Sequence, residues 1–239
     1  MTGDKVVPIK PFKSAEEAYA KGTDDQFETN EMTLGPWTSY SMLHDPRHLC
    51  FTLSRYKFAA KMLYGRTNCV EVGPGDGIGL PILSQAVGTV YAVDWDGRLI
   101  AGNKRRLQEI KNIEHMCYDL NKEDIPLANI DAALTIDVIE HIDPDNEDKF
   151  MRRILKTLHP DAILITGTPN LTAAKYASPR SNAQHINLKS HDTLREMTKK
   201  YCTHVFGFGQ NDDVVHCGYS PMCHYIWSLG VGIKRKYCY

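Results

Sequence analysis

The architecture of this chain follows from the stretch Cys69–Leu80, which reads C-V-E-V-G-P-G-D-G-I-G-L. In this stretch a short apolar run ends in glycines at positions 73, 75, 77 and 79. An apolar run followed by glycines is typical of a buried strand that turns tightly into a helix. Glycine is needed where φ is positive or where a ligand approaches too closely for a Cβ. The stretch therefore predicts a nucleotide-type ligand cradle at a strand end.

Glu71 is an acidic residue inside this apolar run. A carboxylate in a buried strand costs free energy unless it has a partner. We therefore expect Glu71 to act as an acceptor built into the cradle.

The composition sets limits on the class of protein. With 239 residues, 42% hydrophobic and 24% charged, the chain has the size and composition of a soluble protein with one main domain. Its net charge of −1 does not favour a nucleic-acid partner, because nucleic-acid-binding proteins usually carry a basic excess. We expect a small-molecule partner, and the sequence leaves open whether the chain forms a homodimer.

The sequence also predicts a cytoplasmic protein without a metal. Its start lacks the apolar core of a signal peptide, and no run approaches the roughly 18 apolar residues of a membrane span. The seven cysteines include no C-x-x-C pair, which indicates reduced thiols. One cluster could be imagined as metal ligands, but its spacing matches no zinc pattern: His216, Cys217, Cys223 and His224.

The chain divides into two predicted parts. Residues 1–47 are polar and irregular, apart from a short helix at 14–21, and are expected to cover the active site. Trp37 and Tyr40 in this part either pin it to the body or line a pocket. The main domain is expected at 48–239.

Strands and helices alternate in the main domain, after a helix at 49–63. We expect strands at 69–72, 90–94, 113–119, 132–137, 162–169, 204–209 and 224–232. Helices are expected at 79–86, 97–110, 148–158 and 191–201, with Ser190 as N-cap of the last. This order predicts an α/β fold with a seven-stranded, mostly parallel sheet and helices on both faces. The last two strands lack a helix between them, which indicates an antiparallel hairpin at the C-terminal end.

The acidic residues at the strand ends restrict which class of ligand the cradle can bind. The dinucleotide pattern G-x-G-x-x-G would need a third glycine at Ile78, and the phosphate-loop pattern is absent. Asp94 ends the second strand, where a carboxylate can accept hydrogen bonds from ribose hydroxyls. Asp119 follows the third strand. These acceptors suit a ligand with hydroxyls and a cationic part better than a pyrophosphate.

Four motifs together carry a resemblance: V-E-V-G-P-G-D-G (70–77), V-Y-A-V-D-W-D (90–96), Y-D-L (118–120) and A-L-T-I-D-V-I-E-H-I (133–142). The chain resembles the class I S-adenosylmethionine-dependent methyltransferases over about residues 49–232. The E-H-I ending, G-T-P-N (167–170) and H-I-N-L (185–188) look like the small-molecule and sugar O-methyltransferase-like branch. A looser likeness, at D-P-R-H-L-C-F-T-L-S-R-Y-K-F (45–58), is to methyltransferases of bacterial surface-polysaccharide clusters.

The resemblance implies a Rossmann-like fold, S-adenosylmethionine as cofactor and S-adenosylhomocysteine as product. It places the cofactor-binding residues at the ends of the first four strands: Glu71, Gly73, Gly75, Gly77, Asp94, Trp95, Asp119, Leu120 and Asp137. Of these, Asp94 is expected on the ribose, Trp95 beside the adenine, and Asp137 facing both cofactor and substrate.

Three residues are candidates for catalysis: Asp137, His141 and His185. Histidine is the usual proton acceptor near pH 7. The alternatives stay open, because Asp137 could cap a helix, His141 could only brace the site, and His185 could be a structural tie. Candidates for substrate binding are Trp37, Tyr40, Asn170 and Arg180, whose guanidinium could hold a carboxylate or phosphate.

The sequence thus predicts an enzyme that O-methylates a sugar, a nucleotide-linked sugar or a similar polar metabolite. Another small acceptor (a phenol, an amine or a phosphate-type oxygen) is an alternative, as is a non-catalytic binding subunit with this fold. A nucleic-acid methyltransferase is disfavoured, because D-V-I-E is not the N/D-P-P motif expected of amino-group methylation on bases.

Overall fold

The computed structural model describes residues 14–20 and 31–238, and its contacts divide the chain into the units Met1–Thr33 and Leu34–Tyr239. In the first unit, residues 15–20 are helical, in line with the short helix expected at 14–21. The second unit carries the sheet. It begins at Leu34, whereas the sequence placed the start of the main domain at 48, because a helix that was not expected packs with the body.

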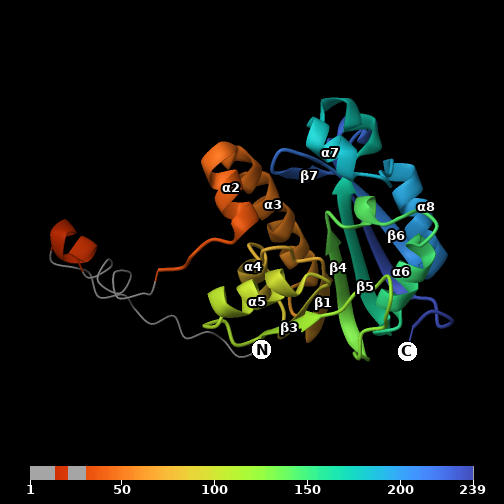
Figure 1. Cartoon of the computed structure of the whole chain (residues 1–239), viewed down its shortest axis with the longest axis horizontal. Helices are drawn as coiled ribbons and strands as arrows, with labels where there is room; N and C mark the ends of the chain where they lie inside the picture. Colours follow the sequence, from red (N-terminus) through yellow and green to blue (C-terminus); the bar gives the residue numbers. More distant parts are fainter. Residues whose placement is uncertain (1–13, 21–30, 239) are drawn as a thin grey trace. The chain divides into compact units, whose positions relative to one another are not determined.

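An eight-stranded sheet forms the centre of the second unit, in the order β3-β2-β1-β4-β5-β8-β6-β7 (Figure 1). The strands are β1 (Asn68–Val72), β2 (Thr89–Asp94), β3 (Ile113–Cys117), β4 (Ile130–Ile136), β5 (Leu158–Pro169), β6 (Cys202–Asn211), β7 (Val214–His216) and β8 (Tyr225–Ile233). β1 to β5 pair in parallel. The strand order reverses between β1 and β4, where open α/β sheets bind their ligands.

The C-terminal part of the sheet is antiparallel, as predicted, but it contains one more strand than expected. β8 pairs antiparallel with both β5 and β6. The additional strand is β7, which pairs with the end of β6 across a turn at Asp212, where φ is +51°. A three-residue strand is too short to show an alternating pattern, so the seven-strand prediction missed it.

Helices cover both faces of the sheet (Figure 1). Hydrophobic side chains of α3 (Pro46–Leu63) and α4 (Leu80–Ser84) pack in one core cluster, and those of α6 (Glu147–Leu155) and α8 (His191–Tyr201) pack in the other. Alternate residues of β4 enter the two clusters, with Leu134 in the first and Ala133 in the second. Both faces are therefore buried, which explains why the strands read as continuous apolar runs.

Six further helical elements belong to the second unit. They are α2 (Pro36–His44), α5 (Gly97–Arg106), α7 (Pro179–Gln184) and the 3-10 helices η1 (Ile139–His141), η2 (Leu171–Tyr176) and η3 (Ser220–Met222). α2 replaces the loop expected at 34–40, and Pro36 stands at its first position, where proline is tolerated. No helix within 14–20 and 31–238 is both long and apolar enough to cross a bilayer.

The predicted N-cap of α8 provides a test of this fold. Ser190 Oγ accepts from Thr193 N at 3.3 Å, and Ser190 N donates to Thr193 Oγ1 at 2.9 Å. We expect Ser190→Ala to lower the free energy of unfolding by about 1 kcal/mol in urea denaturation. Ser190→Asp keeps an acceptor and should stay close to wild type. Equal stability of the two variants would contradict this capping role.

Candidate functional site

The glycine loop between β1 and α4 forms the floor of the candidate site. Gly73 and Gly77 have φ values of +76° and +80°, which other residues rarely adopt. Gly73 N donates to Val93 O at 2.8 Å, so the loop is tied to β2. A Cβ on Gly73 would collide with the Val138 side chain. The loop therefore lies between the ends of β2 and β4.

Glu71 lies beneath this loop and is 1% exposed. Tyr56 on α3 donates its hydroxyl to Glu71 Oε1 at 2.6 Å, a partner that the sequence analysis did not find. Glu71 Oε2 is buried and has no hydrogen-bond partner among the described residues. Burial raises the pKa of Glu71 to about 7, and the Asp94 charge adds to the shift. A donor or a cationic group beside Oε2 would favour its charged form.

Asp94 and Asp119 lie at neighbouring strand ends, because Asp94 pairs with Cys117 and Tyr118 N donates to Asp94 O at 3.0 Å. Asp94 is buried and accepts from Asp96 N at 2.9 Å. Burial raises the pKa of Asp94, against the hydrogen bonds that it accepts. Asp119 is more exposed, and a hydrogen bond from Lys122 lowers its pKa.

The other two residues predicted at these strand ends differ in environment. Trp95 is 70% exposed, so its indole can meet a ligand. Leu120 is buried in a core cluster with Val93 and Ile139, so its side chain supports the sheet.

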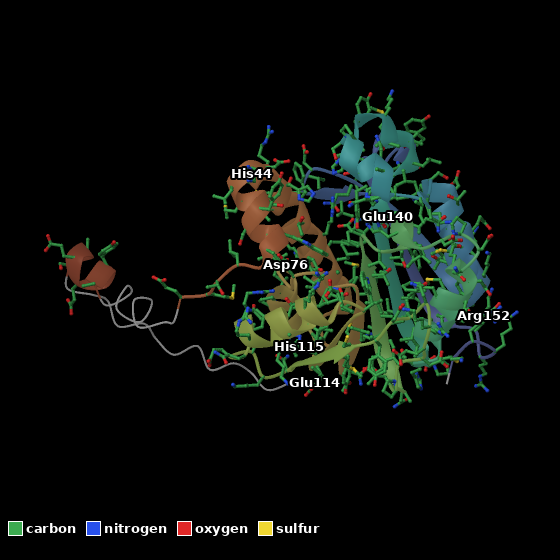
Figure 2. All side chains as sticks on the ribbon, viewed as in Figure 1. His44, Asp76, Glu114, His115, Glu140 and Arg152 are labelled. Atoms are coloured by element: carbon green, nitrogen blue, oxygen red, sulfur yellow. The ribbon has the colours of Figure 1, made fainter. Side chains whose placement is uncertain are left out.

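Asp76 joins α2 to the glycine loop, although the sequence gave it no role. Its Oδ2 accepts from Thr38 N at 2.7 Å and its Oδ1 from Thr38 Oγ1 at 2.9 Å. Asp76 thus caps α2 from a distance, since Gly35 offers no capping side chain. Figure 2 shows Asp76 at the base of α2. A Cβ on Gly75 would lie 2.8 Å from Trp37 Cζ3, so the indole of Trp37 lies against the loop.

Two residues of α5 support the loop from behind, and neither was predicted. Asn103 Nδ2 donates to Gly75 O at 2.8 Å. Arg106 Nη2 donates to Asp76 O at 3.0 Å and to Asn103 Oδ1 at 2.6 Å. In a sequence, polar residues on a helix indicate a solvent-exposed face. The contacts of these two residues with the loop are therefore visible only in the folded structure.

At the end of β4, Asp137 pairs with a buried arginine. Arg55 Nη1 lies 2.6 Å from Asp137 Oδ2, and the guanidinium carbon lies 4.0 Å from the centre of the Tyr225 ring. Asp137 has φ of +55°, which is uncommon for a residue with a Cβ. Its Oδ1 is buried and has no hydrogen-bond partner in the described part of the chain. Arg55 was missed because it lies within a helix pattern, in the stretch 45–58 whose loose likeness gave no residue a role.

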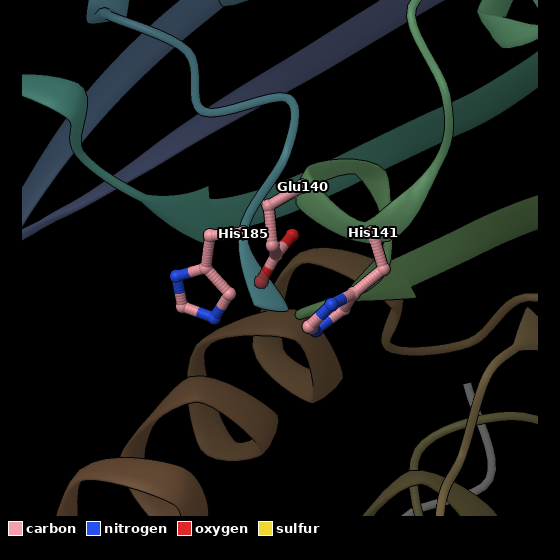
Figure 3. Close-up of side chains that lie close together, drawn as sticks. All are labelled: Glu140, His141 and His185. Atoms are coloured by element: carbon pink, nitrogen blue, oxygen red, sulfur yellow. The ribbon is translucent and has the colours of Figure 1, made fainter. Parts of the chain in front are cut away.

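Beyond Asp137, the chain brings Glu140, His141 and His185 together (Figure 3). One ligand atom of each lies within 4.8 Å of the others. The two imidazole rings are 5.1 Å apart and nearly perpendicular. Burial and the charge of Asp137 raise the pKa of Glu140 to about 8, and burial and His141 lower the pKa of His185. Imidazole nitrogens beside a buried carboxyl group can accept a proton or bind a cation.

Asn187 holds His185 in place. Its backbone N donates to Glu140 O at 3.0 Å, and its Nδ2 donates to Glu147 Oε2 at 2.9 Å. The segment H-I-N-L therefore lies against η1, although 43 positions separate His141 from the nearby Gln184. The motif was noted in the sequence, but the role of its asparagine was not.

The structure corrects one predicted substrate residue. Asn170 is 1% exposed and donates both amide hydrogens to backbone, Ser220 O at 2.9 Å and Cys223 O at 2.8 Å. This amide ties three loops together and is not free for a substrate. Tyr40 is exposed and stacks on His44, with ring centres 4.4 Å apart. Arg180 lies in α7, but its side chain falls outside the described part.

Comparisons with known proteins bear on the family and the fold of this chain. Residues 42–201 match the family model described as methyltransferase domain. A Mycobacterium tuberculosis (strain CDC 1551 / Oshkosh) protein named "Probable S-adenosylmethionine-dependent methyltransferase" is 29% identical over 101 residues, which are 42% of this chain. That match covers 35% of the relative, so the similarity spans about a third of its length.

Solved structures show the same fold. The small RNA methyltransferase HEN1 superposes with a TM-score of 0.62 at 19% identity, over 76% of this chain and 25% of the HEN1 chain. A DhpI–SAH complex superposes with a TM-score of 0.56 at 14% identity, over 90% of this chain and 94% of the other. At these identities the likeness concerns the fold.

The buried Glu71 leads to a prediction about pH. Because its pKa is about 7 when folded and 4.5 ordinarily, the native state keeps a proton that the unfolded chain loses between these values. Its contribution to stability therefore falls as pH rises from about 4.5 to 7. In Glu71→Gln, which still accepts from Tyr56, this loss disappears. From pH 5 to 8 the variant should gain up to about 3 kcal/mol relative to wild type.

Urea denaturation of the ligand-free protein at both pH values measures this gain. Glu114→Gln, on the exposed side of β3, is the matched control. A stability difference between Glu71→Gln and wild type that stays constant with pH would refute the prediction.

Proposed function

Since this chain belongs to the S-adenosylmethionine-dependent methyltransferases, we propose that it methylates a hydroxyl oxygen of a sugar, a nucleotide-linked sugar or a similar polar metabolite. S-adenosylmethionine is the methyl donor and S-adenosylhomocysteine the product. A role in surface-polysaccharide biosynthesis in the cytoplasm would fit the resemblance at residues 45–58.

The proposed reaction is an in-line displacement. A lone pair of the acceptor oxygen forms a bond to the methyl carbon while the carbon–sulfur bond breaks and its electrons pass to sulfur. The positive charge of the sulfonium is lost, and the hydroxyl proton must leave the acceptor. The donor is already activated, so the protein mainly has to align the two atoms, exclude water and provide for the proton.

The observation that carries the proposal is the convergence of His141 and His185 beside the glycine loop. Val138 packs on Gly73, so the segment that leads to His141 lies against the proposed cofactor cradle. Alcohols need help with proton removal, and imidazole is suited to that task near pH 7. An amine would need less help, which makes the two histidines an argument for a hydroxyl acceptor. Asp137 is proposed to face both ligands, and its charge acts on His185.

The cofactor is proposed to lie across the ends of β1 to β4. Glu71 would face its methionine end, Gly73, Gly75 and Gly77 would pass beneath it, and Asp94 would accept from the ribose hydroxyls. Trp95, Asp119 and Leu120 would surround the adenine.

The segment from residue 34 to 47 is proposed to cover the cofactor. Trp37 lies against Gly75, and Asp76 holds the helix that carries Trp37. Tyr40 and Arg180 remain proposed substrate contacts on the outer side of the site.

A nucleic-acid acceptor is the second candidate. The observation that favours it is the structural likeness to the small RNA methyltransferase HEN1, because an RNA ribose also offers a hydroxyl. The net charge of −1 opposes it. Phenols, amines and phosphate-type oxygens are the remaining acceptors, and a binding subunit without turnover is the remaining function.

Asp94→Asn tests the proposed ribose contact. We expect isothermal titration calorimetry to show S-adenosylhomocysteine binding about tenfold weaker or worse, because a charged acceptor of two hydroxyls is lost. Asp131→Asn is the control at the opposite end of the sheet, on β4, and should bind like wild type. If Asp94→Asn also binds like wild type, Asp94 does not hold the ribose.

A panel of acceptors tests the reaction. Enzyme and methyl-labelled S-adenosylmethionine are incubated separately with nucleotide sugars, free sugars, a phenol, an amine and a single-stranded RNA oligonucleotide. Label is expected in the sugars. Label only in the RNA would establish the second candidate, and label only in the phenol or amine would overturn hydroxyl methylation of sugars.

A further inference from the structure

Glu140 is a buried residue, and one of its two carboxyl oxygens can still bind a ligand. It is fully buried, and its Oε2 accepts from Thr168 Oγ1 at 2.9 Å. Its Oε1 is also buried and has no hydrogen-bond partner in residues 14–20 or 31–238. Orphaned carboxylate oxygens are costly in a protein interior, so this atom points to a ligand that is positively charged or donates a hydrogen bond.

The two histidines are arranged so that this ligand can be a metal ion. Figure 3 shows the Glu140 carboxylate between the rings of His141 and His185. His141 Nδ1 lies 3.1 Å from Gln184 O, a contact in which that nitrogen carries the hydrogen and Nε2 keeps its lone pair. Metal-binding histidines usually donate their second nitrogen to a carbonyl in this way. Glu140 is held similarly by Thr168, and the segment with His185 by Asn187.

We propose that Glu140, His141 and His185 bind one divalent transition-metal cation. Two imidazole nitrogens and one carboxylate oxygen favour ions such as Mn²⁺, Co²⁺ or Zn²⁺, whereas Mg²⁺ prefers oxygen alone. Ligand atoms at about 2.0–2.2 Å from a common ion lie at most about 4.4 Å apart. The three ligand atoms lie within 4.8 Å of one another. A shift of a few tenths of an ångström, by rotation of the exposed His141 ring, closes the site.

Three protein ligands leave coordination positions open for substrate, as in catalytic metal sites. This part of the inference rests on the proposed function: the acceptor hydroxyl would occupy an open position beside the cofactor. The cation would lower the pKa of that hydroxyl, and the proton would pass to water as the oxygen attacks the methyl carbon. His141 and His185 would then be ligands, and neither would need to act as a base. The sequence analysis expected no metal, and the only cluster it considered as ligands was a different one, at His216, Cys217, Cys223 and His224.

Metal binding can be measured without any acceptor. The full chain is stripped with a chelator and titrated with Co²⁺ by absorption spectroscopy and with Mn²⁺ by calorimetry. We expect one ion per chain and visible Co²⁺ bands typical of nitrogen and oxygen ligands. His185→Ala and His141→Ala should weaken binding about 100-fold, and Thr168→Val about tenfold. His204→Ala, an exposed histidine of β6, is the matched control and should bind like wild type.

His141 is exposed, so His141→Ala tests the site even if substitutions at Glu140 disturb folding. Absence of binding to wild type, unchanged binding in both histidine variants, or equal loss in His204→Ala would overturn the inference. Turnover of a sugar acceptor without bound metal and unaffected by the chelator would also overturn it and would leave the proposed function standing. Intact metal binding without methylation of any hydroxyl would instead overturn the proposed function alone.

Discussion

The ion pair between the buried Arg55 and the partly exposed Asp137 fixes the geometry on which the site depends. It joins α3 to the end of β4 at 2.6 Å, and Arg55 itself is 6% exposed. Arg55 would be a buried charge without a partner if this contact were lost, so the contact holds the two elements together. Asp137 accepts a left-handed conformation there, and the chain turns at once into η1. The directions of Glu140 and His141 follow from that turn.

Burial of acids recurs along this edge of the sheet and has a common consequence. Desolvation raises the pKa of Glu71, Asp94 and Glu140. Buried acids lower the stability of the ligand-free protein. They cluster at functional sites, because binding and catalysis need groups with shifted pKa values. Glu71 and Glu140 each keep an oxygen without a hydrogen-bond partner within the described ranges. These two oxygens support the proposed ligands at two points, one beneath the glycine loop and one beside the histidines.

The sequence predicted the parts of the fold that depend on local patterns. The apolar strands, the glycine turn and the Ser190 cap are all encoded by neighbours in the chain, and the acids at strand ends follow from the strands. The sequence analysis did not predict β7, because three residues are too few to show a periodic pattern. It did not predict α2, because the turn-forming residues in that segment indicated a loop. The cofactor was predicted from the family resemblance of four motifs, because local patterns alone do not identify it.

The contacts that shape the candidate site were beyond local patterns. Asp76 meets Thr38 across 38 positions, and Arg55 meets Asp137 across 82. Such pairs become visible only when the order of the strands is known. His141 and His185 were predicted separately, but their approach depends on Asn187, whose bonds to η1 and α6 no spacing reveals.

The cofactor cradle and the histidine cluster meet at the contact of Gly73 with Val138. No Cβ fits on Gly73, so the loop and the segment after β4 approach as closely as their atoms allow. The distance between the loop and this segment varies little, because direct contact between packed atoms sets it, whereas a flexible loop would let it vary. Methyl transfer requires the acceptor atom to lie in line with the carbon–sulfur bond, and misplacement by about 1 Å can cost about 100-fold in rate. In the proposed reaction, the glycine at position 73 would serve alignment as well as the turn, because it keeps the loop and the segment after β4 at one fixed separation.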